Sequence, residues 1–144
     1  LRDNVGLGQD DCSEEHILEC LKAAGADFVG DGTTAALEFA IQDQGSNLSG
    51  GQKQAVMMAR ALAFKPALLL FDEPTSAMDG LTESNVIKHL SEHLDDRTLV
   101  IVTHKMPVVA MCDRVIVMDQ GRIVGDGTKD AYFELLKKQS EKKN

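Results

Sequence analysis

The sequence predicts an α/β fold in which a parallel sheet is joined to an α-helical subdomain. Short apolar runs of strand length alternate with amphipathic, helix-length segments through the second half of the chain. This order is typical of parallel sheets with crossover helices. The first half instead reads as helices and turns, without such strands. We therefore expect a helical subdomain over residues 1–65 and an α/β half over residues 66–144.

The helical half is expected to contain two main helices. Ser13 is suited to cap a helix that runs to about Ala24, because its hydroxyl can bond a free amide of the first turn. Gly25 is a suitable stop for that helix. A second helix is expected over residues 50–65, which are rich in helix-forming residues and precede a proline. A short helix is expected around residues 34–39.

The second half is expected to alternate buried strands with helices. The predicted strands cover residues 67–71, 98–102 and 114–118, with a short one at 122–124 after a Gln120-Gly121 turn. The predicted helices cover residues 81–94, 106–111 and 128–138.

Two carboxylates follow the first predicted strand. Asp72 and Glu73 end the apolar run, and ligands of α/β sheets bind at the carboxyl ends of strands. A carboxylate there can hold Mg²⁺, and its neighbour can polarise an attacking water. His104 follows the second strand, so its imidazole is expected at the same edge. The structural alternatives are a charged turn for the pair and a packing role for the histidine.

Ser49, Gly50 and Gly51 open the second main helix. Backbone N–H groups at a helix N-terminus attract anions, and glycine lets an anion approach them closely. The same three residues would also serve as a flexible capping loop. The chain contains no Gly-x-x-x-x-Gly-Lys-Ser/Thr segment, the loop that cradles nucleotide phosphates.

These pieces, in this order, resemble the nucleotide-binding domain of ABC transporters. Residues 48–52, Leu-Ser-Gly-Gly-Gln, resemble the family's signature sequence, and residues 68–73 resemble its Walker B strand with the catalytic glutamate. Residues 76–79 are similar to the D-loop, His104 to the switch histidine, and residues 118–124 to the closing hairpin. The resemblance covers essentially the whole chain and implies a partial P-loop NTPase core over residues 66–144.

A finer resemblance is to exporter-type members. Residues 1–5 resemble the segment after the exporters' Q-loop, and residues 13–29 resemble the helical subdomain of bacterial type I secretion ATPases. Asp43 departs from the glutamate that exporters usually carry at that turn.

The resemblance implies a Mg²⁺-dependent ATPase whose domains work as a head-to-tail pair. In the domain's own site, Asp72 would hold Mg²⁺, Glu73 would act as the base and His104 would contact the γ-phosphate of ATP. Asp79 would communicate across the dimer. The signature residues would cap the ATP held by the partner domain; they are Ser49, Gly50, Gly51 and Gln52.

For the intact protein, the resemblance implies ATP hydrolysis coupled to export, protein secretion included, at the cytoplasmic face of the bacterial inner membrane beside a transmembrane domain. A soluble ABC ATPase of the DNA-repair or translation type is an alternative. A non-catalytic module that completes another subunit's site is a second alternative.

The chain begins at Leu1 rather than Met, as a piece of a longer protein would. In the family, the Walker A loop and the Q-loop precede the first residue of this chain. We therefore expect the chain alone to bind ATP very weakly and to hydrolyse none. Without the Walker A strand two strand edges would be unpaired, so we expect a dimer, a rearranged sheet or poor stability.

Composition narrows the function classes further. Residues 1–50 hold ten acidic and two basic side chains, whereas residues 51–144 hold thirteen of each. The chain lacks a basic footprint, which argues against a nucleic-acid partner. Three cysteines without paired spacing favour a reducing compartment. No apolar run reaches the roughly eighteen residues that span a bilayer.

Two further patterns have metal-binding spacings. Residues 89–93 match the H-x-x-E-H pattern of inverted zincins, in which two histidines hold zinc. Cys12, His16 and Cys20 recur every fourth residue, as on one face of a helix. Each set lacks an evident further ligand, so we expect ordinary helix surfaces at both.

Overall fold

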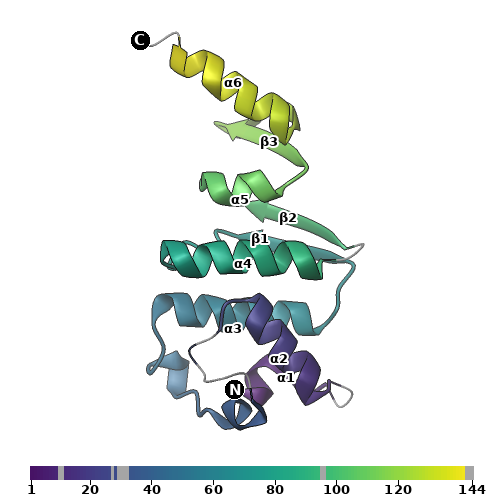
Figure 1. The fold of residues 1–144 in the computed structure, drawn as a ribbon, viewed down its shortest axis with the longest axis vertical. Coiled ribbons are helices and arrows are strands. Elements are labelled where there is room, and N and C mark those ends of the chain that lie inside the picture. The colour runs from purple at the N-terminus through teal and green to yellow at the C-terminus, as the bar shows by residue number, and fades with distance from the viewer. Residues whose placement is uncertain (10–11, 27, 29–32, 95–96, 142–144) are drawn as a thin grey trace. The chain divides into compact units, whose positions relative to one another are not determined.

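The computed structural model describes residues 1–9, 12–26, 28, 33–94 and 97–141, with only the backbone described for 139–141. The chain forms two compact units, Leu1–Val102 and Thr103–Asn144. Figure 1 shows the helices and strands of the chain. The boundary predicted between residues 65 and 66 falls within the first unit and stays a prediction. Residues 27 and 29, at the end of the exporter-like stretch, lie outside the described residues.

The first unit begins with helical elements whose ends follow the sequence signals. These are α1 (Arg2–Gly6), α2 (Glu14–Ala23), the 3₁₀ helices η2 (Thr34–Glu38) and η3 (Asp43–Gly45), and α3 (Gly50–Ala63). Ser13 caps α2, its hydroxyl accepting a hydrogen bond from the His16 amide at 3.2 Å, and Gly25 follows the helix at φ 72°. α3 ends slightly earlier than predicted, since Lys65 takes φ 48° before Pro66, which disfavours a helical residue in front of it.

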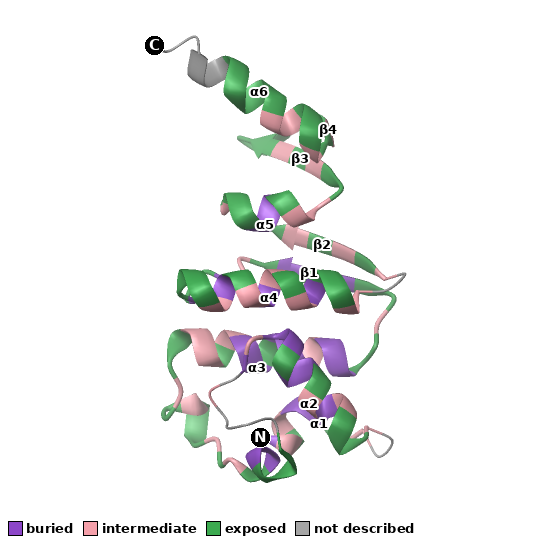
Figure 2. Cartoon of the chain, viewed as in Figure 1, coloured by how far each residue is buried: buried purple, intermediate pink, exposed green. Residues whose placement is uncertain are grey.

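The core of these helical elements lies where α1 and α2 pack against α3. Figure 2 shows buried residues in purple along the facing sides of these helices. Each large apolar side chain removed from water stabilises the fold by about 1.5–3 kcal/mol. The buried side chains include Val5, Ile17, Leu21, Ala59 and Leu62.

A parallel strand pair completes the first unit. It consists of β1 (Leu68–Asp72) and β2 (Thr98–Val102), connected through α4 (Gly80–His93). In the register, Leu68 lies opposite Thr98 and Asp72 opposite Val102. The predicted α/β fold with parallel strands is confirmed for this pair.

Burial alternates along β1 instead of covering both faces. Leu69 and Phe71 are buried, whereas Leu68 and Leu70 are 51% and 68% exposed. The prediction of a fully buried strand was therefore wrong. Since successive strand residues point to opposite faces, the described residues of the first unit cover only one face of this sheet.

The second unit contains an antiparallel hairpin, as the resemblance implied. Its elements are α5 (Met106–Met111), β3 (Arg114–Asp119), β4 (Arg122–Thr128) and α6 (Lys129–Glu141), with β3 and β4 paired. Gln120 and Gly121 make the turn at φ 45° and 74°, the two positive values that a type I′ turn requires. Across the hairpin, Arg114 Nε and Nη2 donate to the two carboxylate oxygens of Asp126 at 2.8 and 2.7 Å.

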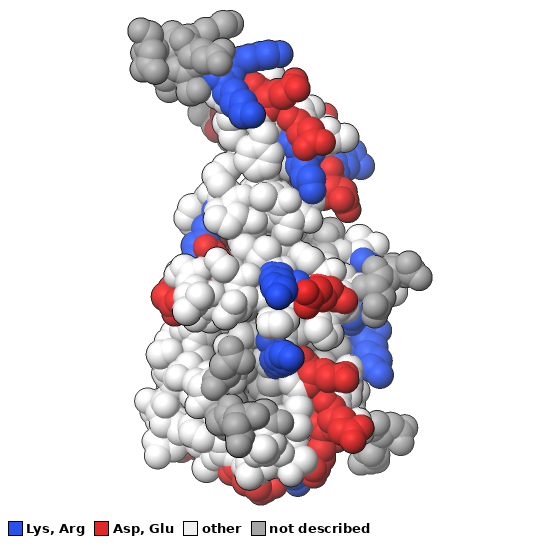
Figure 3. All heavy atoms as spheres, viewed as in Figure 1, with Lys and Arg blue, Asp and Glu red and all other residues white. Residues whose placement is uncertain are grey.

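Acidic side chains gather over α1 and α2 on the face drawn in Figure 3. This agrees with the excess of acidic residues in positions 1–50. Within the described part of the chain, no helix has both the length and the apolar character that crossing a membrane requires.

Candidate functional site

Asp72 and Glu73 follow one another at the carboxyl end of β1. Asp72 is the last residue of the strand and its side chain is exposed. Glu73 follows at φ 45°, in the left-handed region that non-glycine residues seldom adopt. Its amide donates to the carbonyl of Val102 at 2.9 Å, so the end of β2 holds this turn in place. Neighbouring strand ends thus position the predicted acidic pair.

His104 lies just past the end of β2, and it belongs to the second unit. Its side chain is exposed. The acidic pair belongs to the first unit. A shared site for this imidazole and the carboxylates stays a prediction.

Ser49 and Gln52 cap α3 reciprocally. Ser49 Oγ accepts from the Gln52 amide at 3.2 Å, and Gln52 Oε1 accepts from the Ser49 amide at 2.8 Å. This capping box satisfies two backbone donors at the helix start. The Ser49 side chain remains exposed and its hydroxyl proton can still be donated to an anion.

Gly50 and Gly51 pack against the turn that follows β1. A Cβ atom on Gly51 would lie 2.8 Å from the carbonyl oxygen of Ala77, and one on Gly50 would lie 3.2 Å from the Ala77 Cβ. A contact below 3.0 Å to backbone forces something to move. Close packing therefore requires glycine here independently of any anion. The partner is 26 residues away in sequence for Gly51, so the local pattern carried no signal of it.

Gln54 joins α3 to the same turn. Its Nε2 donates to the Glu73 carbonyl at 3.3 Å and to Ser76 Oγ at 2.7 Å. Its Oε1 accepts from the Ala77 amide at 3.0 Å. One glutamine in a helix has no local signature, so the sequence alone predicts no function for this residue. We name residues 73–77 together with Gln54 and Gly51 the α3–turn junction.

Asp79 caps α4. Its Oδ1 accepts from the amides of Leu81 and Thr82 at 3.0 Å each, and its Oδ2 accepts from the Thr82 hydroxyl at 2.8 Å. The hydrogen bonds from Thr82, its amide first, lower the pKa of Asp79 below its usual value. The carboxylate therefore stays charged at neutral pH. The predicted role of Asp79 across a dimer stays a prediction.

The two metal-spaced patterns make internal contacts. No group of three or more metal-ligating side chains occurs among the residues that the structure describes. His89 Nδ1 lies 3.5 Å from Glu92 Oε2, at ion-pair distance but without hydrogen-bond geometry. His93 Nδ1 lies 2.8 Å from the carbonyl of His89, and Arg97 Nη2 donates to the carbonyl of His93.

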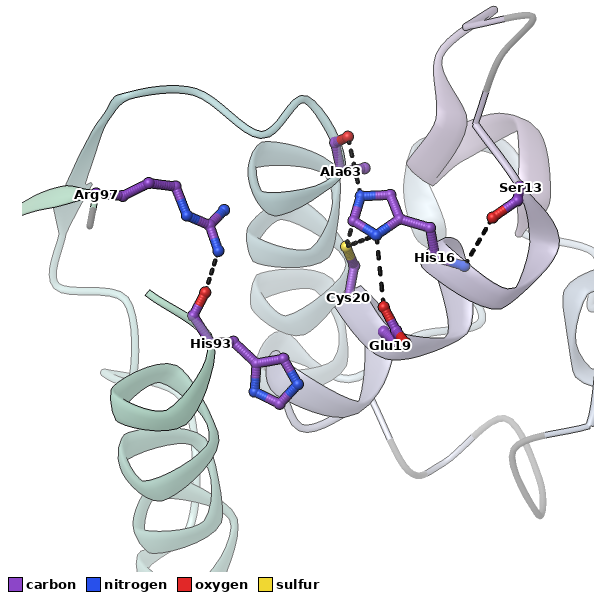
Figure 4. Close-up of polar contacts among 7 residues, drawn as sticks. All are labelled: Ser13, His16, Glu19, Cys20, Ala63, His93 and Arg97. Carbon is purple, nitrogen blue, oxygen red and sulfur yellow. Dashed lines mark hydrogen bonds and ion pairs between the residues drawn. The ribbon is translucent and has the colours of Figure 1, made fainter. Parts of the chain in front are cut away.

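Cys20 lies within the helical core beside His16 (Figure 4). Its Sγ is 3.6 Å from Nε2 of His16, which is also 3.3 Å from the carbonyl of Ala63. Burial raises the pKa of the Cys20 thiol to about 12. The Cys20 thiol is thus a buried group of the helical core, in contact with the imidazole of His16.

Comparisons with known proteins relate the chain to ABC transporters. Residues 9–76 match the family model described as ABC transporter. The chain is 38% identical, over 99% of its length, to an ATP-dependent lipid A-core flippase of Neisseria gonorrhoeae, of which it covers 24%. It is 39% identical, over 94% of its length, to the alpha-hemolysin translocation ATP-binding protein HlyB of Escherichia coli O157:H7, of which it covers 19%.

A solved structure is similar as well. It is a bacterial Atm1-family ABC exporter with ATP bound, matched with a TM-score of 0.81 and 31% identity over 92% of this chain and 24% of that one. The chain thus spans about a quarter of the length of this exporter and of the flippase, and less of the translocation protein.

Proposed function

The chain carries ABC transporter ATP-binding-domain sequence of the exporter type, and from this premise we propose that it forms part of the machinery that hydrolyses ATP to drive export. The observation that carries the proposal is the acidic pair at the end of a parallel strand. Asp72 offers exposed carboxylate oxygens, which are the ligands that Mg²⁺ prefers. Bound Mg²⁺ would neutralise phosphate charge.

Glu73 is the proposed general base. Its backbone turns out of the strand at φ 45° and is held at the end of β2. From there its carboxylate would orient a water and accept its proton as the water attacks the terminal phosphate of ATP. His104 would donate a hydrogen bond to that phosphate.

The start of α3 is proposed to serve a second nucleotide, held by a partner domain in a head-to-tail dimer. The exposed Ser49 hydroxyl and the positive end of the α3 dipole suit a phosphate. Gly50, Gly51 and Gln52 would shape this cap. Asp79, which already fixes the start of α4, would contact the partner domain.

We propose that the intact protein works at the cytoplasmic face of the bacterial inner membrane with a transmembrane domain. We propose that the exported cargo is a protein, which the translocation proteins among the relatives support. A lipid is the second candidate, supported by the flippases, one of which matches 99% of the chain. Transmembrane helices upstream of Leu1 would exclude a soluble ABC ATPase, and a Walker A loop there would exclude a non-catalytic module.

The test is ATP hydrolysis by the full-length protein carrying Glu73→Gln. This change keeps the size of the side chain and removes the base, so we expect hydrolysis to fall by about 10²–10⁴-fold while ATP still binds. Glu134→Gln, on the exposed surface of α6, is the matched control and should hydrolyse ATP normally. Wild-type hydrolysis by Glu73→Gln would refute the proposed role.

A further inference from the structure

We propose that Gln54 is a positioning residue that holds the catalytic base and ties it to the nucleotide cap on α3. The inference rests on the proposed role of Glu73 as base. Gln54 lies outside the signature and Walker B segments, and we assign it one structural task. That task is to fix the peptide that follows Glu73.

The backbone of Glu73 needs support from its surroundings. A non-glycine residue at φ 45° lies in a sparsely populated region and persists only where its surroundings hold it. Two hydrogen bonds meet this need. The Glu73 amide donates to the Val102 carbonyl at 2.9 Å, and the Glu73 carbonyl accepts from Gln54 Nε2 at 3.3 Å. The peptides on both sides of the strained residue are thus fixed.

The side-chain amide of Gln54 matches the groups that it faces. A backbone N–H can only donate and a backbone carbonyl can only accept. Oε1 faces the Ala77 amide at 3.0 Å, while Nε2 faces the Glu73 carbonyl and the Ser76 hydroxyl. The partners therefore fix which way the amide points. A carboxylate of the same size would keep the bond from Ala77 and lose the one to Glu73.

The turn that carries Glu73 is also connected to the start of α3. Gly51 approaches the Ala77 carbonyl so closely that a Cβ would meet it at 2.8 Å. Gln54, three residues along the same helix, bonds the amide of the same residue. The beginning of α3 and the turn that carries Glu73 therefore move as one block. A nucleotide seated on the cap would bias the position of the base that serves the other nucleotide.

The experiment compares two substitutions in the full-length protein. Gln54→Met removes all three hydrogen bonds, whereas Gln54→Glu removes the donation to the Glu73 carbonyl and keeps an acceptor for Ala77. We expect both to lower kcat for ATP hydrolysis by about tenfold to a hundredfold, with KM for ATP within about twofold. Met57→Gln, at a 64% exposed position on the same helix, is the control and should match wild type.

Hydrogen–deuterium exchange supplies a readout independent of activity. The peptide that contains Ala77 should exchange faster in Gln54→Met and stay protected in Gln54→Glu. A wild-type kcat in Gln54→Glu, beside an inactive Glu73→Gln, would overturn this inference alone. A loss of thermal stability and a rise in KM that parallel the loss of kcat would also overturn it. Wild-type hydrolysis by Glu73→Gln would instead defeat the proposed function.

Discussion

At the scale of single residues, some glycines in this chain are required by backbone conformation and others by close packing. The sequence alone does not distinguish the two. Gly8 and Gly25 both take positive φ, at 71° and 72°. Only Gly25 is also crowded, because a Cβ there would lie 2.6 Å from Cγ2 of Val86, whereas Gly8 has nothing within 4 Å. Conformation and packing can therefore be tested apart.

We expect Gly25→Ala to destabilise the chain more than Gly8→Ala. Both alanines would have to adopt the left-handed conformation, at about 1–2 kcal/mol. The alanine at position 25 would add an overpacking cost of about 1–3 kcal/mol against Val86. Urea unfolding of the two variants measures the difference. Equal losses of unfolding free energy would mean that α2 and α4 adjust without cost.

Cys20 should resist alkylation in the folded chain. Its side chain is only 5% exposed, and burial raises its pKa to about 12, so at pH 8 the thiolate is on the order of one in ten thousand. Iodoacetamide at pH 8, followed by mass spectrometry, should leave Cys20 unmodified until urea unfolds the chain. Modification of Cys20 before unfolding, at the rate of the more exposed Cys12, would contradict this.

At the scale of elements, the first turn of α4 is joined to the turn before it by a buried polar contact. Thr75 is 2% exposed and Glu83 is 9% exposed. The Thr75 hydroxyl donates to Glu83 Oε1 at 2.5 Å. Charged groups are seldom buried without such partners, so this bond helps to place the turn of residues 73–77, which Gln54 also contacts.

We expect Thr75→Val to destabilise the chain by about 1–3 kcal/mol, because it keeps the shape of the side chain and removes a donor to a buried carboxylate. Ser84→Ala is the matched control. It removes a hydroxyl that donates to the Gly80 carbonyl at 2.8 Å on the exposed side of the same helix, and its effect should be within about 0.5 kcal/mol. Thermal unfolding of both would show whether the buried bond matters more.

The β3–β4 hairpin should weaken as the solution is acidified. The hydrogen bond from Arg114 lowers the pKa of Asp126 below its usual value. The ion pair between them therefore stabilises the hairpin fully at pH values above the pKa that Asp126 has in the unfolded chain. That contribution is lost as pH falls through the lower, folded value. An NMR titration should show the pKa of Asp126 rising in Arg114→Gln and unchanged in Lys138→Gln. An unchanged value in both would show that Arg114 does not hold the carboxylate.

The sequence predicted most elements to within a few residues, because their signals are local. Ser13, Gly25 and the Gln120-Gly121 turn lie beside the helix or hairpin that they begin or end. The acidic pair was likewise found from one strand and its end. The α3–turn junction could not be predicted in this way. Gln54 meets its partners 19 to 23 positions away, and only the packing of α3 on that turn brings them together.

At the scale of the whole molecule, β1 and β2 expose a large share of their apolar side chains. On β1 and β2, Leu68, Leu70, Val100 and Val102 are between 47% and 68% exposed. The strand sequence predicted burial because apolar content is visible in a sequence. Whether other elements cover the exposed face of these strands depends on tertiary packing, which the strand sequence does not contain. In the described residues the strands form two separate pairs, β1–β2 and β3–β4.

We expect this surface to make the isolated chain self-associate. Leu70 and Val100 lie opposite each other in the register, 68% and 47% exposed, and together they offer apolar area whose burial between copies favours association by about 1.5–3 kcal/mol for each side chain. Threonine favours strands, so replacing both residues with threonine should leave β1 and β2 intact. The change should weaken self-association by about tenfold or more. Light scattering across a concentration series measures the effect.

The control for that experiment is Leu69→Thr, one position along β1 and only 2% exposed. Because successive strand residues face opposite ways, this change falls on the buried face and should lower the thermal stability of the chain without relieving self-association. The pair of variants thus separates the two faces of one strand. A wild-type chain that is monomeric at every concentration and highly stable to heat would show that the exposed face needs no cover.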